Sequence, residues 1–112
     1  MAIKITRFTE ETASPSHEGT ILASPVFSDG FTPPFGHAYG YLANGGEMDA
    51  HAHPTEEVYI ILSGTGTITV GHEEAAVGPG DVIEIPPDQR HTIKSQPGCP
   101  LLWAAFWWKT PG

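Results

Sequence analysis

From residue 36 onward, the sequence alternates short apolar runs with clusters of turn-forming residues. The runs are rich in Val, Ile, Thr, Tyr and Trp, which favour extended backbone, and the clusters are rich in Gly, Pro, Asn and Asp. This alternation predicts an all-β domain, built either as a sandwich or as a closed barrel. The expected strands cover residues 37–43, 57–62, 66–70, 74–77, 81–85, 90–95 and 101–108.

Residues 1–35 are less regular. The first seven residues alternate apolar and polar side chains as a strand does, and residues 20–23 can form a second short strand. A long helix is excluded by Pro15, Pro25, Pro33 and Pro34. We therefore expect one domain over residues 1–112, in which residues 36–108 form the β core. Residues 1–35 add an N-terminal strand and an irregular segment that wraps over a sheet or lies at a dimer contact.

The size and charge of the chain limit the kinds of molecule that it is expected to bind. The 112 residues are enough for one small domain, which a closed barrel, a metal or a dimer interface would help to stabilise. A formal net charge of −8 with only five Lys and Arg argues against binding to nucleic acid. We expect no membrane partner, because no run of about 20 apolar residues is present and the N-terminus lacks the apolar core of a signal peptide. The single cysteine, Cys99, excludes an intrachain disulfide, so a cytoplasmic location is the default expectation.

Two of the expected strands are apolar on both faces. Side chains alternate across a strand, so if Glu57 points inward, Tyr59 and Ile61 do the same, and the apolar side chains between them point outward. The run Leu101–Trp108 has the same two-sided character. Both faces then need covering, and a homodimer is the simplest way to cover the outer one.

Four side chains form a candidate metal site. His51 and His53 are two residues apart, which places both imidazoles on one face of an extended segment. After a turn at Pro54, a return of the chain can bring the Glu57 carboxylate beside them, and His91 can close the site from a later strand. Three imidazoles and a carboxylate suit one divalent ion, such as Mn, Fe, Ni, Zn or Co, and on an octahedral ion they leave two positions for water or substrate.

The same stretches resemble the two sequence motifs of the cupin superfamily. The first motif is matched at Gly45, His51, His53, Glu57 and Gly64, and the second at Gly80, Pro86 and His91. The second motif departs at Asp88, where the family usually has Gly, and at Ser95, where it usually has Asn; Asp tolerates a left-handed backbone, so we expect the turn at Asp88 to be kept. The resemblance implies a small jelly-roll β-barrel with His51, His53, Glu57 and His91 as metal ligands. It does not imply one reaction, because the superfamily contains many enzymes as well as binding and storage proteins.

The remaining candidates lie outside the two motifs or beside the four ligands. His37, Tyr39 and Tyr41 share one face of a strand and would line the pocket if that face points inward; otherwise they pack in the core or at a dimer contact. We take His37, Tyr39 and Tyr59 as candidate catalytic residues, with His37 in proton transfer and Tyr59 on the face of Glu57. One face of the Trp-rich last strand is expected to floor the pocket. Of the other polar residues, Asp49 is either a hydrogen-bond partner of a ligand imidazole or a solvated turn residue. Gln89 is a candidate for the pocket mouth, and His17 and His72 are expected to be solvated.

These features favour an enzyme that acts on a small oxygenated or carboxylated metabolite at one metal ion. Isomerase, decarboxylase or lyase chemistry is as compatible with the site as dioxygenase chemistry. The alternative is a non-catalytic module that binds a sugar or another metabolite through the metal.

Overall fold

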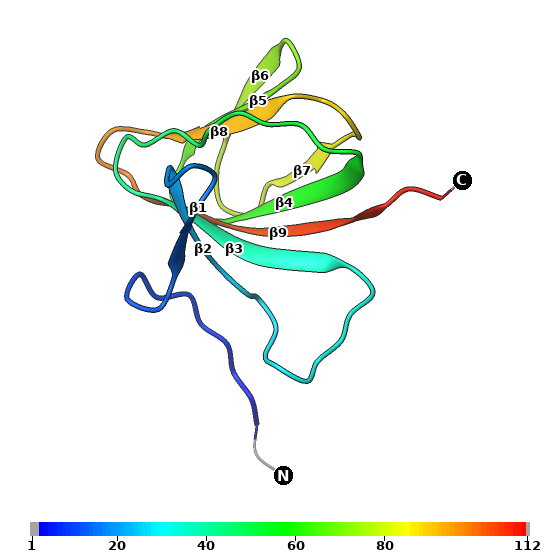
Figure 1. The fold of residues 1–112 in the computed structure, drawn as a ribbon. Coiled ribbons are helices and arrows are strands. Elements are labelled where there is room, and N and C mark those ends of the chain that lie inside the picture. The colour runs from blue at the N-terminus through cyan, green and yellow to red at the C-terminus, as the bar shows by residue number, and fades with distance from the viewer. Residues whose placement is uncertain (1–2, 112) are drawn as a thin grey trace.

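Residues 3–111, which a computed structural model describes, form nine strands in two antiparallel sheets (Figure 1). The larger sheet has six strands in the order β1-β2-β3-β9-β4-β7, and the smaller has three in the order β6-β5-β8. The strands are β1 (Ser14–Ser16), β2 (Ile21–Ser24), β3 (Gly36–Leu42), β4 (Thr55–Ser63), β5 (Gly66–Val70), β6 (Glu73–Val77), β7 (Val82–Ile85), β8 (His91–Ser95) and β9 (Leu101–Lys109). The all-β prediction is confirmed. Residues 3–111 contain no helix of the length and apolarity that crossing a bilayer would need.

The N-terminal segment follows the prediction only in part. The short strand predicted near residues 20–23 is β2, which pairs with β3. The strand predicted over residues 1–7 is not formed at residues 3–7, and residues 1–2 lie outside the described part of the chain. In Figure 1 this arm leaves the body of the barrel, so it lacks the neighbouring strand that an extended segment needs for stability.

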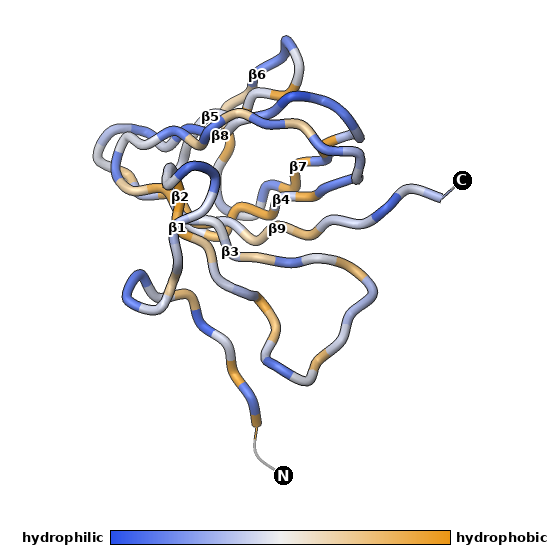
Figure 2. Tube along the Cα trace, in the orientation of Figure 1, coloured by the Kyte–Doolittle hydropathy of each residue, from blue (hydrophilic) through white to orange (hydrophobic). Residues whose placement is uncertain are grey.

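The core lies between the two sheets. Strand β9 is central to the larger sheet, because it pairs with β3 on one side and with β4 on the other. Orange apolar stretches run along these strands in Figure 2. The largest fully buried side chains include Trp103, Leu42, Ile61, Ile85, Ile93 and Leu101.

The pairing register decides which side chains face the core. Glu57 lies opposite Trp107, Tyr59 opposite Ala105 and Ile61 opposite Trp103, so all six share the inner face. The glycines Gly36 and Gly40 of β3 lie opposite Trp107 and Trp103, and a methyl group added at either glycine would overlap with the facing indole. The predicted alternation of Glu57, Tyr59 and Ile61 is confirmed, since all three are buried.

The outer face of β4 and its neighbours remains partly uncovered. Val58 and Ile60 are half-buried, whereas Leu62, Val82 and Trp108 are exposed by 44%, 60% and 36%. The apolar character of this face, expected from the sequence, is therefore present at the protein surface.

Candidate metal centre

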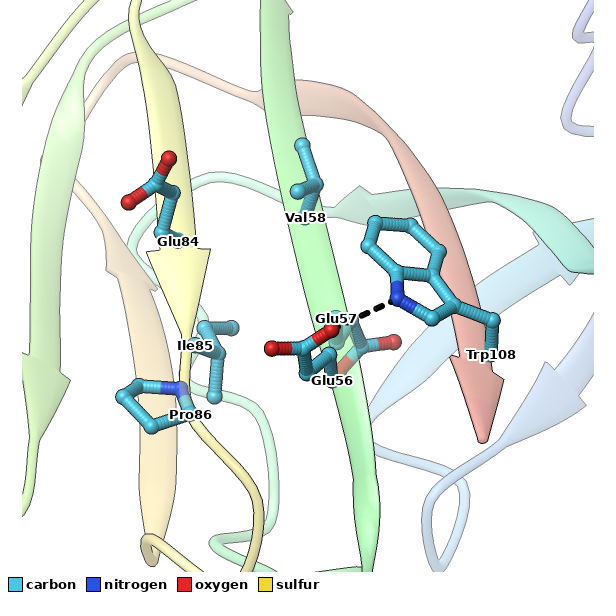
Figure 3. A pocket seen from close by; sticks show the side chains of 7 residues that line it. All are labelled: Glu56, Glu57, Val58, Glu84, Ile85, Pro86 and Trp108. Carbon is cyan, nitrogen blue, oxygen red and sulfur yellow. Dashed lines mark hydrogen bonds between the residues drawn. The ribbon is translucent and has the colours of Figure 1, made fainter. Parts of the chain in front are cut away.

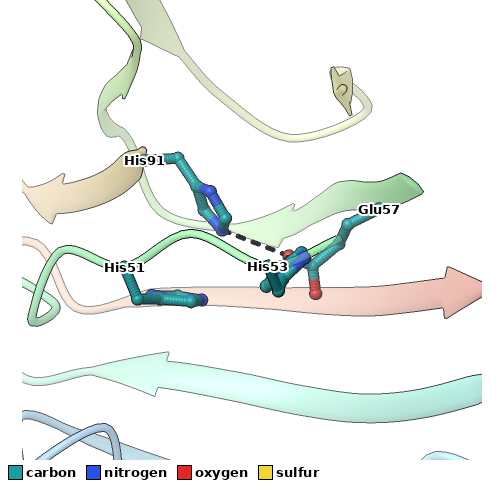
Figure 4. A group of neighbouring side chains, drawn as sticks. All are labelled: His51, His53, Glu57 and His91. Atoms are coloured by element: carbon teal, nitrogen blue, oxygen red, sulfur yellow. Dashed lines mark hydrogen bonds and ion pairs between the residues drawn. The ribbon is translucent and has the colours of Figure 1, made fainter. Parts of the chain in front are cut away.

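Four side chains converge on one point (Figure 4). His51 and His53 lie on the segment between β3 and β4, Glu57 lies on β4, and His91 is the first residue of β8. Each offers a nitrogen or oxygen atom within 4.8 Å of those of the other three. The His-His-Glu-His cluster predicted from the sequence is therefore assembled, and it is suited to one metal ion.

Backbone hydrogen bonds bring the two halves of the cluster together. The His51 amide donates to the His91 carbonyl at 3.1 Å, and the His91 amide donates to the His51 carbonyl at 2.8 Å. A third bond, from the Asp88 amide to the His53 carbonyl, is 2.7 Å long. Asp88 has a φ of 65°, so the left-handed turn expected at this position is confirmed.

The imidazoles are oriented by oxygen atoms on their outer sides. His51 Nδ1 lies 3.2 Å from the Asp49 carbonyl, and His91 Nδ1 lies 2.9 Å from the Gln89 carbonyl. A carbonyl only accepts, so both Nδ1 atoms carry the proton and the Nε2 lone pairs face the centre. His53 Nδ1 is 2.8 Å from the Thr55 hydroxyl, which accepts in the same way when His53 binds metal. Asp49 and Gln89 thus contribute through their backbone.

The donor set fits a divalent cation. Glu57 Oε1 lies 2.9 Å from His53 Nε2 and 3.3 Å from His91 Nε2. His91 Nε2 is fully buried, and its contact with Glu57 does not have the geometry of a hydrogen bond. A buried nitrogen without a partner is costly, and an ion held among these atoms would satisfy it. Partial burial lowers the pKa of His51, which favours the neutral ring that a metal ligand needs.

The neighbouring carboxylate, Glu56, is not part of the cluster. It points to the opposite face of β4, where its Oε1 accepts a hydrogen bond of 2.7 Å from the Trp108 indole (Figure 3). Glu84 and Val58 line the same outer pocket. The alternation of the strand therefore selects Glu57 and places Glu56 outside.

The expectation that His37 and Tyr41 line the pocket is wrong, whereas Tyr39 does line the inner hollow. The partners of these three residues on β9 are Phe106, Ala104 and Leu102, which belong to the outer face. His37 Nδ1 accepts a hydrogen bond of 3.0 Å from the Val26 amide, and the two tyrosines pack against Phe8. The inner positions of β3 are small because Trp103 and Trp107 fill the space, and this pairing is set by the register with β9.

Tyr59 does share the face of Glu57, but it lies deep in the core. Its ring stacks on Trp103 at 5.5 Å between centroids, and its hydroxyl contacts Met48 Sδ at 3.7 Å. Burial, and then the charge of Glu57, raise the pKa of Tyr59 well above its ordinary value. Tyr59 therefore forms part of the cavity floor, as an uncharged residue.

The prediction that His17 is solvated is also wrong. His17 is half-buried, and its Nε2 atom lies 3.3 Å from Nε2 of His51. The sequence carries no metal-site spacing that includes this residue; only the pairing of β1 with β2 brings it to the cluster. His72 is exposed, as expected.

A cavity of about 320 Å³ opens beside the cluster. It is lined by His17, His51, His53, Thr55, Glu57 and Trp107. A second hollow of about 240 Å³ reaches inward from His17 and Glu57 along Ala38, Tyr39, Gly40, Tyr59, Trp103 and Ala105. Trp103 and Trp107 thus form part of the pocket floor predicted for the last strand, and the combined space suits a small, partly apolar molecule.

Comparison with known proteins identifies the family. A family model described as a cupin domain matches residues 39–105, which is more than half of the chain. The chain is a member of the cupin family. Over 52 residues this cupin is 44% identical to an uncharacterized protein from Methanocaldococcus jannaschii. That alignment covers 46% of this chain and 42% of the other, so it spans less than half of the relative's length.

Solved structures support the same fold. A cupin 2 conserved barrel domain protein from Salinispora arenicola matches with a TM-score of 0.84 and 20% identity, over 98% of this chain and 92% of the other. A predicted oxalate decarboxylase from Thermotoga maritima matches with a TM-score of 0.72 and 20% identity, over 80% and 81% of the two chains. These similarities confirm the jelly-roll barrel.

Proposed function

We propose that this cupin is a metal-dependent enzyme that acts on a small oxygenated or carboxylated metabolite. One observation carries the proposal: the cluster is buried on one side and open on the other. Glu57 and His91 are buried, whereas His51 and His53 are only partly buried and line the cavity. An ion held by these four residues is therefore reachable by a small molecule, as a functional site requires and a closed structural site does not.

The residues around the cavity have different roles in the proposed site. His51, His53, Glu57 and His91 hold the ion, and the Asp49, Gln89 and Thr55 oxygens keep the imidazoles oriented. The bound ion supplies a cation that stabilises negative charge on substrate oxygen atoms. Trp107 and the apolar inner hollow accept a hydrocarbon portion. Among residues 3–111, no Lys or Arg lines either hollow, so an acidic substrate has only the ion as its positive partner.

The reaction class that we favour is redox-neutral: isomerisation, decarboxylation or lyase chemistry on a keto, hydroxy or carboxylic acid. The fold similarity to a predicted oxalate decarboxylase supports a search among small acids. Dioxygenase chemistry is the second candidate, because three imidazoles and one carboxylate also suit Fe and Mn.

The test compares adjacent carboxylates. Wild-type protein, Glu57→Gln and Glu56→Gln are loaded with Mn, Fe, Co, Ni or Zn and assayed on keto acids, sugar acids, oxalate and diketones, with and without oxygen. We expect turnover by the wild type and by Glu56→Gln, and none by Glu57→Gln, because only Glu57 lies in the cluster. Turnover that needs oxygen would support the dioxygenase. Absence of turnover, together with thermal stabilisation by one of these compounds, would overturn the proposal of an enzyme and favour a metal-dependent binding module.

We also propose that the protein forms a homodimer. The outer face of β4, β7 and β9 exposes Leu62, Val82 and Trp108, and a second copy of this chain would cover it. The N-terminal arm and the loop before β3 extend away from the barrel in Figure 1 and carry the exposed residues Ile3, Ile5 and Phe31. Projecting apolar segments of this kind can pack against the barrel of a second copy of the chain.

A further inference from the structure

A fourth histidine meets the cluster from the N-terminal hairpin. His17 lies at the turn between β1 and β2, and its ring centroid is 4.4 Å from that of His51. The two Nε2 atoms are 3.3 Å apart. His17 also lines both hollows of the pocket, so it stands where the inner and outer parts of the cavity meet.

The hairpin holds His17 in this place. His17, Glu18 and Gly19 all have left-handed backbone, with φ of 52°, 58° and 75°. Two consecutive non-glycine residues in this region are unfavourable, so the surrounding contacts must hold the turn. Those contacts come from Thr20: its hydroxyl donates to the His17 carbonyl at 2.6 Å, and its oxygen accepts a hydrogen bond of 2.8 Å from the Asp49 amide.

The last of these bonds ties the hairpin to the segment that carries His51. Asp49 also accepts from His51 Nδ1 through its carbonyl, so a single residue positions both the hairpin and the ligand imidazole. Any movement of the hairpin relative to the cluster must break or strain the bond between Thr20 and Asp49.

His17 is oriented in the same manner as the three other histidines. Its Nδ1 atom lies 3.0 Å from the Ser16 hydroxyl, and its Nε2 atom is directed toward the cluster. The corresponding outer partners of His51, His53 and His91 are also oxygen atoms. An oxygen on Nδ1 with Nε2 turned inward is the usual arrangement of a metal-binding histidine.

The distance between the two Nε2 atoms fits ligation of one ion. His51 uses its proton on Nδ1, so its Nε2 lone pair faces His17. Two nitrogens that each bind an ion at about 2.1 Å are about 3.0 to 3.4 Å apart when the angle between the bonds is between a right angle and the tetrahedral value. The observed 3.3 Å lies in this range.

We propose that His17 is a fifth protein ligand, carried to the ion by the β1–β2 hairpin. The inference rests on the proposed metal centre and deepens it. With His17 bound, an octahedral ion keeps one position for an outside molecule instead of two. A substrate that binds through two oxygen atoms then has to displace His17, and the hairpin controls access to the second position.

Paramagnetic proton NMR of the Co(II)-loaded protein counts the ligands directly. Each coordinated imidazole with a protonated Nδ1 gives one strongly shifted, exchangeable signal. We expect four such signals for the wild type and for His72→Ala, and three for His17→Ala. Three signals in the wild type would overturn the fifth ligand while leaving the metal centre intact, and no shifted signals would overturn both.

Affinity gives a second, independent readout. Competition with a chelator is expected to show that His17→Ala binds Co(II) or Zn(II) about 10-fold or more weakly than His72→Ala, a loss of the size seen when groups that support a metal site are removed. Thermal melting of the metal-free proteins shows whether a variant has lost fold stability rather than metal affinity. Ser16→Ala removes only the partner of His17 Nδ1, so its metal affinity should lie between those of His17→Ala and His72→Ala. Equal affinities for His17→Ala, His72→Ala and the wild type would refute the proposal.

Discussion

His51 and His91 exchange two backbone hydrogen bonds, of 3.1 and 2.8 Å, at the point where the segment after β3 meets the first residue of β8. This bridge aligns two imidazoles whose Nδ1 protons are already committed to backbone carbonyls. The orientation of these two imidazoles is therefore set by the main chain, whereas the outer partner of His53 is a side chain.

Replacement of His91 should empty the site. His91→Ala removes the most deeply buried ligand, so we expect purified protein to carry much less divalent metal than the wild type, which should hold about one ion per chain. His72→Ala is the matched control, because His72 is exposed in a turn. Metal analysis of the three proteins makes the comparison, and full occupancy in His91→Ala would contradict the assignment.

Replacement of the adjacent residues Glu56 and Glu57 should have very different effects on metal affinity. Glu57→Gln replaces the carboxylate that lies 2.9 Å from His53 Nε2, so metal affinity should fall about 10-fold or more. Glu56→Gln changes only a surface hydrogen bond to Trp108, and its affinity should match that of the wild type. Titration with a metal-sensitive dye measures both values. Similar losses in the two variants would mean that the strand does not present Glu57 alone to the ion.

The metal-free protein should lose stability as the pH falls below about 6.5. Burial lowers the pKa of both His51 and His17 from the ordinary value of 6.5. Between the lowered values and 6.5 the unfolded chain binds more protons than the folded one, so the free energy of unfolding decreases as the pH falls through this window.

Urea unfolding of the metal-free protein at several pH values measures this dependence. The double variant His17→Ala/His51→Ala should show a shallower slope than the wild type. An identical slope would assign the effect to other groups.

A methyl group on β3 should disturb the core. In Gly40→Ala the new methyl overlaps with the indole of Trp103, which is 1% exposed and stacks on Tyr59. We expect a destabilisation of about 1–3 kcal/mol, the usual cost of overpacking. The control, Gly78→Ala, brings its methyl only to 3.7 Å from the Thr65 side chain and should be nearly neutral. Denaturant unfolding measures the free energy of unfolding of both variants. A Gly40→Ala protein as stable as the wild type would contradict the close packing of the indole against β3.

A charge on the outer face should produce a monomer. Leu62→Glu and Val82→Glu place carboxylates in the exposed apolar face, so they should shift the proposed dimer to monomer in a sedimentation experiment at micromolar concentration. Metal content should stay unchanged, because neither residue belongs to the cluster. A wild-type protein that sediments only as a monomer would remove the dimer proposal.

Local patterns were sufficient for the strands from residue 36 onward and for the four residues of the cluster, but not for the N-terminal segment. The alternation along β4 places Glu57 inside and Glu56 outside, because successive side chains of a strand point to opposite faces. The same rule did not predict which way His37 and Tyr41 point: they share one face of the strand, but the register with β9 turns that face outward. Nothing local to β3 states which face is inner, although Gly36 and Gly40 mark the crowded side once the tryptophans opposite them are known.

The sequence by itself determined the all-β class, the turns and the spacing that puts His51, His53, Glu57 and His91 within reach of one ion, since these depend on periodicity and residue type. Tertiary structure decided the rest. The pairing of β3 with β9 kept His37 and Tyr41 out of the pocket, and the β1–β2 hairpin brought His17 to His51. Both outcomes depend on contacts between segments far apart in the chain, and a contact of that kind leaves no periodic trace in the residues that make it.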